Sequence, residues 1–105
     1  MILRTAKSTF VASTFAAMAA HQDEMQGSFA SIEIGEHTVD VDACETADEM
    51  AAAIREDLAD VIDAVRDEAA LTGDAQTVTD CDAATTDIAA LERVCAVLSD
   101  AAAQD

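Results

Sequence analysis

The chain lacks most of the side chains that enzymes use for chemistry. It has no tryptophan, no tyrosine and only two histidines, His21 and His37, among 105 residues. Histidine is the commonest general acid or base, so only two positions offer that role. Three glycines, with no Gly-x-Gly among them, cannot form the glycine-rich loops that cradle phosphates. We therefore expect a non-enzymatic protein with no catalytic residues and no cofactor.

Basic side chains are also scarce. The five that exist are scattered singly along the chain: Arg4, Lys7, Arg55, Arg66 and Arg93. Contact with nucleic-acid phosphates requires clustered Lys or Arg, and anionic membrane surfaces attract the same clusters. The sequence therefore disfavours nucleic acid and membranes as partners. Other proteins are the expected ones, as further copies of the chain or as members of a larger assembly.

The residues that could bind a metal have the wrong spacing. An EF-hand loop beginning at Asp40 would need glycine at its sixth position and glutamate at its twelfth, where the chain has Glu45 and Ala51. The three cysteines contain no close pair with zinc-ligand spacing, and their odd number is unlike a disulfide framework. We expect no metal and three reduced, mostly buried thiols, with one disulfide plus one free thiol as the alternative. These cysteines are Cys44, Cys81 and Cys95.

What the chain has in excess is acid. Twenty-two Asp and Glu face five Lys and Arg, for a formal net charge of −17. Self-repulsion on this scale opposes a compact state, and molar salt screens it. Acid excess, a single lysine and abundant alanine resemble the composition of proteins from extreme halophiles, the haloarchaea in particular. The alternative is an acidic protein of a mesophile with a GC-rich genome, or of its phage.

The first 26 residues favour an amphipathic helix over residues 1–26. On a helix, six large apolar side chains would share one face, and this face is our candidate interface if it does not pack on the core. Those residues are Leu3, Phe10, Val11, Phe15, Met18 and Met25. A signal-like segment ending at Ala17-Met18-Ala19 is the weaker alternative. The run is too short and too polar to span a membrane.

Residues 28–43 predict a β-hairpin. Ala30, Ile32 and Ile34 alternate with polar residues, as do Val39 and Val41. Glycine at the first central position of Gly35-Glu36 is typical of a two-residue type II′ turn. In that register Ile34 pairs with His37 and Ile32 with Val39, so all the apolar side chains share one face.

Two helices are predicted after the hairpin. Thr46 and Glu49 form a capping box, and apolar residues at spacings of three and four extend the first helix over 47–71. A similar stripe predicts a second helix over 83–102. Between them, the β-branched stretch 76–79 predicts a short third strand or an extended loop.

These elements predict an α+β fold in one domain, residues 1–105: an N-terminal helix, a β-hairpin and two antiparallel helices. The alternative is a mostly α-helical bundle. The predicted function is that of a non-enzymatic structural or assembly protein of a halophilic system, for example a small virion or tail component of a halophile virus. A small cytoplasmic regulatory or adaptor domain of a haloarchaeon, which binds one protein, is the alternative. A cytoplasmic or virion location is favoured over a secreted one.

The halophile interpretation predicts that folding depends on salt. The Debye length falls from ~10 Å at 0.1 M salt to ~3 Å at 1 M, so repulsion among the acids should weaken steeply over this range. We expect an expanded or unfolded chain at about 0.1 M KCl and a compact, helical one at about 3 M. Far-UV circular dichroism and light scattering across this range will measure the transition. Equal folding at both ends would contradict the halophile interpretation.

Overall fold

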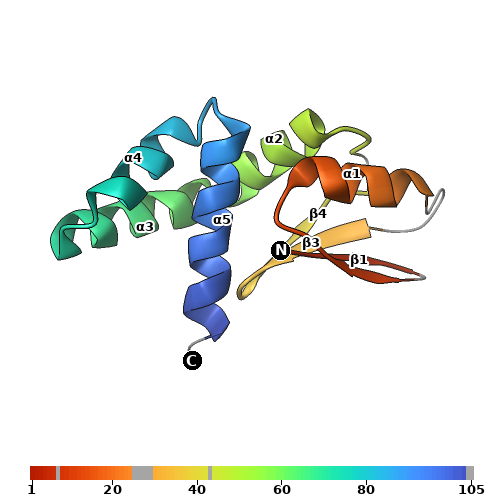
Figure 1. Cartoon of the computed structure of the whole chain (residues 1–105), viewed down its shortest axis with the longest axis horizontal. Coiled ribbons are helices and arrows are strands. Elements are labelled where there is room, and N and C mark those ends of the chain that lie inside the picture. Colours follow the sequence, from red (N-terminus) through yellow and green to blue (C-terminus); the bar gives the residue numbers. More distant parts are fainter. Residues whose placement is uncertain (7, 25–29, 43, 104–105) are drawn as a thin grey trace.

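The computed structural model describes residues 1–6, 8–24, 30–42 and 44–103, and it has the α+β class that the sequence predicts. Nine elements follow one another along the chain (Figure 1). Their order and bounds are β1 (Ile2–Thr5), β2 (Thr9–Val11), α1 (Phe15–Glu24), β3 (Ala30–Ile34), β4 (His37–Asp40), α2 (Ala47–Asp57), α3 (Ala59–Thr72), α4 (Ala75–Ala83) and α5 (Ile88–Ala103).

The four strands form one antiparallel sheet in the order β2-β1-β3-β4. One face of the sheet is apolar and lies under α1 and α2 (Figure 1). Leu3, Ile32 and Val39 form a row of cross-strand partners on that face, and all three are buried. The other face carries polar side chains, including the Arg4–Glu33 ion pair at 2.7 Å between β1 and β3.

The predicted hairpin of residues 28–43 is confirmed over the described residues 30–42. Ile34 pairs with His37 and Ile32 with Val39, in the predicted register. The ladder continues beyond the strands, because the Val41 amide donates to the Ala30 carbonyl at 3.1 Å. The turn glycine, Gly35, has φ +60°, which a side chain would disfavour.

The predicted helix over residues 1–26 is wrong in its first half. Residues 2–5 and 9–11 are the paired strands β1 and β2, and the helix begins only at Phe15. The turn is closed by the Thr5 amide, which donates to the Ser8 carbonyl at 2.9 Å. Leu3 and Phe10 share one helix face because they lie seven residues apart, and they are also cross-strand partners in this hairpin. Burial of Leu3 against β3 favours the sheet over the helix.

The predicted helix over 47–71 is found as two helices. Thr46 caps α2 as expected, because its hydroxyl oxygen accepts from the Glu49 amide at 3.2 Å. The chain then bends at the buried Leu58, which has φ −107° and ψ 17°. Backbone hydrogen bonds continue across the bend, because the Ile62 amide donates to the Leu58 carbonyl at 2.8 Å. The bend directs α3 away from the sheet (Figure 1).

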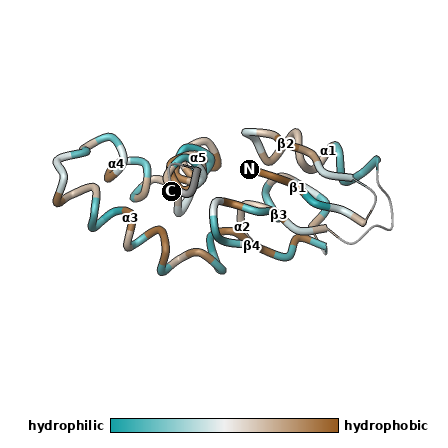
Figure 2. The backbone as a smooth tube through the Cα atoms, turned by 90° about the horizontal axis from the view of Figure 1, so that it is seen from below, coloured by the Kyte–Doolittle hydropathy of each residue, from teal (hydrophilic) through white to brown (hydrophobic). Residues whose placement is uncertain are grey.

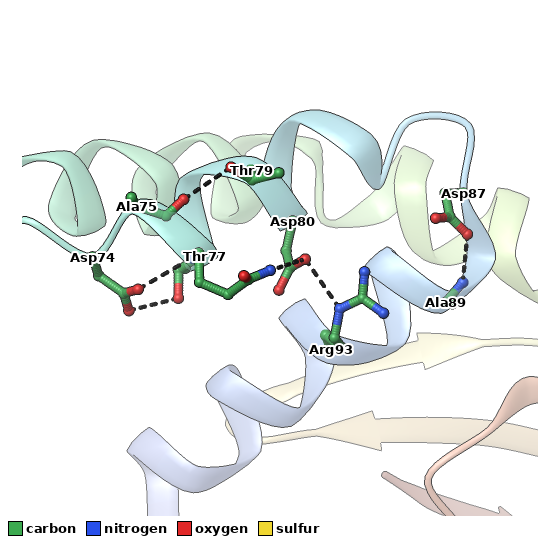
Figure 3. Close-up of polar contacts among 9 residues, drawn as sticks. Asp74, Ala75, Thr77, Thr79, Asp80, Asp87, Ala89 and Arg93 are labelled. Carbon is green, nitrogen blue, oxygen red and sulfur yellow. Dashed lines mark hydrogen bonds and ion pairs between the residues drawn. The ribbon is translucent and has the colours of Figure 1, made fainter.

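The predicted strand over 76–79 is also wrong, because these residues lie within α4. Asp74 caps this helix by accepting from the Thr77 amide at 3.2 Å and the Thr77 hydroxyl at 2.6 Å (Figure 3). These bonds satisfy a free helix-terminal amide and lower the pKa of the Asp74 carboxyl. Burial of Thr77 and Cys81 then offsets the weak helix propensity of the β-branched residues.

The last helix and its orientation differ from the prediction as well. The expected helix over 83–102 begins at Ile88, after α4 has ended at Ala83, and Asp87 accepts from the Ala89 amide at its start (Figure 3). The two long predicted helices are not antiparallel neighbours. Instead α3 lies beside α4, and α5 packs against α4 and α2 (Figures 1 and 2).

The molecule is elongated, with extents of 44 × 30 × 19 Å. The sheet and α1 lie at one end, and the α3–α4 pair lies at the other (Figure 2). The core joins the two ends through α2 and α5. Its largest fully buried side chains are Phe15, Leu3, Met18, Ile32, Ile34, Met50, Ile54 and Leu91.

One long-range bond fixes α1 to α5. The Glu92 carboxylate accepts from the Phe15 amide at 2.7 Å, across 77 residues of sequence. Phe15 is the first residue of α1, so its amide has no partner within the helix. A carboxylate at a helix N-terminus also complements the helix dipole. Glu92 therefore positions the helix that supports the β1–β2 hairpin.

Loss of this carboxylate should destabilise the protein. We expect Glu92→Ala to lower the free energy of unfolding by about 1–2 kcal/mol, because a buried helix amide loses a charged acceptor. Glu92→Gln should lower the free energy of unfolding by about half as much, because the glutamine side-chain oxygen can still accept the hydrogen bond but carries no charge. Urea unfolding in concentrated KCl measures both. Glu68→Ala, at an exposed acid of α3, is the control and should change stability by less than about 0.5 kcal/mol. Equal effects at the two positions would contradict this role.

Candidate interaction surface

The N-terminal segment carries none of the chain's acids. The first acidic residue is Asp23, so all 22 Asp and Glu follow the β1–β2 hairpin and most of α1. Two basic residues, Arg4 and Lys7, precede it. The β1–β2 hairpin and most of α1 therefore carry none of the negative charge that dominates the rest of the chain, although Glu33 of the neighbouring β3 lies against Arg4 of β1.

Strand β2 lies at the edge of the sheet within this acid-free segment. The Ala12 amide donates to the Met1 carbonyl at 3.1 Å, and the Thr5 amide to the Ser8 carbonyl at 2.9 Å. Backbone groups alternate in direction along a strand, so those of Phe10 face β1 and those of Thr9 and Val11 face outward. The edge thus presents backbone donors and acceptors at two positions.

Side-chain contacts hold this edge against α1. The Phe10 ring stacks on His21, with 4.3 Å between centroids and 8° between planes. His21 Nε2 lies 2.9 Å from the Ser8 hydroxyl. This serine–histidine pair has the distance of a nucleophile and its base, but in the described residues no carboxylate bonds to the other ring nitrogen to orient it. The visible effect of the pair is to fix β2 and its turn relative to α1.

The structure divides the six predicted interface residues. Three of them, Leu3, Phe15 and Met18, are fully buried in the core. Phe10 is half-buried on His21, and Val11 is 71% exposed. Met25 lies outside the described residues. Of the described ones, Phe10 and Val11 therefore remain available at the surface, and they are neighbours on β2.

The sequence prediction missed the backbone edge and its outward-facing Thr9. A helix satisfies its own backbone groups, so a helical interpretation of residues 1–26 offered only side chains for contact. The acid-free composition of the segment was the available signal, because every other stretch of similar length carries acids. It indicates which part of the surface differs from the rest, although it does not reveal a strand.

A hollow of about 350 Å³ lies between α2, α3 and α4. Arg55 and Arg66 line it together with Asp63 and Asp82, so its charges balance. Arg55 Nε donates to the Ala84 carbonyl at 2.6 Å, and Arg66 Nε to Asp82 at the same distance. Both arginines thereby fasten α4 to the helices before it.

The cysteines show no sign of activation. All three are free thiols; Cys81 and Cys95 are buried and Cys44 is half-buried. Burial raises the pKa of each thiol, and nearby carboxylates raise those of Cys44 and Cys81 further. The pKa of Cys95 reaches about 12. Such thiols stay protonated near neutral pH, whereas a nucleophile or a metal ligand needs the thiolate.

The described residues form neither a metal-binding cluster nor a membrane-spanning helix. No group of three or more His, Cys, Asp or Glu side chains is placed to hold a metal ion in this part of the chain. None of the helices, over the same residues, has the length and apolar character needed to cross a bilayer.

No protein-family model, curated protein or solved structure shows significant similarity to the chain.

The buried Cys95 thiol predicts a loss of stability at high pH. The unfolded chain releases this proton above about pH 9, whereas the folded chain keeps it until about pH 12. Rising pH therefore favours the unfolded state, by up to about 1.4 kcal/mol per pH unit between these values. Urea unfolding at about pH 8 and about pH 10.5 measures the fall. Cys95→Ala should show a shallower fall, and an unchanged slope would contradict the assignment.

Proposed function

We propose that this chain is a non-enzymatic assembly protein, which works by packing against copies of itself or against other proteins. The observation that supports this function best is the uncharged, exposed edge strand β2 on a chain of net charge −17. A small virion or tail component of a halophile virus is one concrete form of such a protein.

Electrostatics supports contact through the acid-free residues 1–22. Two bodies of the same sign repel, and the repulsion is greatest where acids approach one another. Contact through residues 1–22 would bring no carboxylate of this segment against a partner. Val11, 71% exposed beside the half-buried Ile2 on β1, would supply apolar surface for burial. The remaining acidic surface would stay in solvent.

A second candidate is a regulatory or adaptor domain that binds one partner. The hollow between α2, α3 and α4 favours it, because a concave site with an apolar wall, two arginines and two aspartates suits a single inserted side chain. This function would require one stable complex of fixed stoichiometry and no larger assembly.

An acid placed on β2 should prevent association. We expect light scattering at about 3 M KCl to show a mass above that of one chain, rising with protein concentration. Val11→Glu should shift the chain toward the monomer, because it introduces charge and removes apolar contact. Leu71→Glu is the matched control, since Leu71 is 89% exposed at the end of α3. This variant should associate like the unmodified chain.

Two outcomes would contradict the proposal. A monomer at every concentration and salt, without capture of further proteins into an assembly, would exclude an assembly role. Isolation of one equimolar complex with a single protein, unaffected by Val11→Glu, would favour the adaptor function instead. Disruption of that complex by Arg66→Ala would then place the contact at the hollow.

A further inference from the structure

We propose that two copies of this chain join by antiparallel pairing of their β2 strands about a two-fold axis at Phe10. The result is one continuous eight-stranded sheet across the dimer. This inference rests on the proposed assembly function and specifies its first contact.

The backbone of β2 is complementary to itself in this arrangement. With Phe10 opposite Phe10 of the second copy, Thr9 of each copy faces Val11 of the other. Thr9 and Val11 are the two residues whose amide and carbonyl groups face away from β1. Each Thr9–Val11 pair can exchange two hydrogen bonds, as a hydrogen-bonded pair of an antiparallel ladder does. If the register shifted by one residue, Phe10 of one copy would lie opposite Thr9 or Val11 of the other. The backbone groups of Phe10 face β1, so that pair could not exchange hydrogen bonds.

The side chains suit the same register. Phe10 lies on the helix-covered face, in the row of Leu3 and Ile32, so the two Phe10 rings would meet across the axis. Their stacking on His21 already holds them in place, which lowers the entropy lost on pairing. Val11, exposed in the single chain, would pack against Thr9 of the second copy on the open face. Cross-strand pairs of this kind stabilise sheets.

A second copy fits this edge better than an unrelated strand. Close approach of two chains of charge −17 is opposed everywhere that acids face each other. The two-fold axis at Phe10 brings together the acid-free segments of both copies and directs their α3–α4 ends apart. A three-residue strand is short, so the pairing should be weak at low salt and strengthen as salt screens the remaining repulsion.

Proline scanning of the edge tests the pairing. Val11→Pro removes an outward amide and leaves the bonds between β1 and β2, so we expect a folded chain that is monomeric at about 3 M KCl. Thr38→Pro is the matched control. Thr38 lies on the opposite edge strand, β4, and its amide also faces outward because Val39 and Val41 bond to β3. This variant should keep the dimer mass of the unmodified chain.

Disulfide cross-linking tests the register of the paired β2 strands independently of the proline variants. In a Cys44→Ala background, a mixture of Thr9→Cys and Val11→Cys chains should form a cross-linked heterodimer on oxidation, since facing Cα atoms lie about 5.5 Å apart. Val11→Cys alone should not cross-link, because its copies would lie two residues out of register, beyond the ~7 Å limit for a disulfide.

The outcomes separate the two proposals. Association that persists in Val11→Pro, together with absent or non-selective cross-linking, overturns β2 pairing and leaves the assembly function standing. Loss of association in Thr38→Pro but not in Val11→Pro moves the contact to β4 and overturns the pairing as well. A chain that is monomeric at all salts overturns the assembly function itself.

Discussion

The scarcity of positive charge is the constraint on which the rest of this structure depends. Each of the four arginines bonds an acceptor outside its own helix or strand. Arg4 bonds Glu33 between β1 and β3, and Arg93 bonds the buried Asp80 at 3.0 Å between α5 and α4 (Figure 3). The other two, Arg55 and Arg66, fasten α2 and α3 to α4 and its end. The four arginines are thus all used in contacts between elements.

Two of these four bonds end within α4 and a third ends at Ala84, the residue that caps it, and they help a helix with poor intrinsic propensity to form. Thr77, Val78 and Thr79 are β-branched, which favours a strand. The Asp74 cap satisfies the start of the helix, and Arg93 and Gln76 both donate to Asp80 within it. Of these two donors Arg93 is charged, and a charged donor makes a strong contact with a nearly buried carboxylate. The Asp74 cap and the Gln76 bond are local, but the Arg93 bond comes from α5, 13 residues away from Asp80, so no local sequence pattern could reveal that contact.

The parts of the fold that the sequence predicts are those in which one local rule decides. Register in the β3–β4 hairpin follows from alternation and from Gly35, because any slip would expose Ile32. The start of α2 follows from the capping pair at Thr46. The N-terminal segment is different, since Leu3 and Phe10 satisfy a helix stripe and a hairpin pairing equally well. Pairing with β3 favours the hairpin over the helix, because β3 forms a ladder with β1 although its residues lie 25 or more positions further along the chain.

Because the N-terminal segment fits a helix and a hairpin equally well, only part of the interaction surface could be predicted from the sequence. Periodicity placed Val11 beside core residues such as Leu3, because on a helix they would share a face. In the sheet, Val11 points to the opposite side from Leu3 and is exposed. The side-chain chemistry of the candidate surface was therefore available from the sequence, whereas the free backbone edge required knowledge of the sheet order.

The two edges of the sheet differ in the protection that edge strands usually need. Exposed edges invite pairing with other chains, and charged side chains commonly prevent it. The outer strand β4 carries Asp40, followed by Asp42, and it contacts α2. Strand β2 has no charged residue, although acids are the commonest surface side chains of this chain. A composition that charges nearly every exposed element but leaves one edge uncharged is best explained if that edge is covered in the working state of the protein.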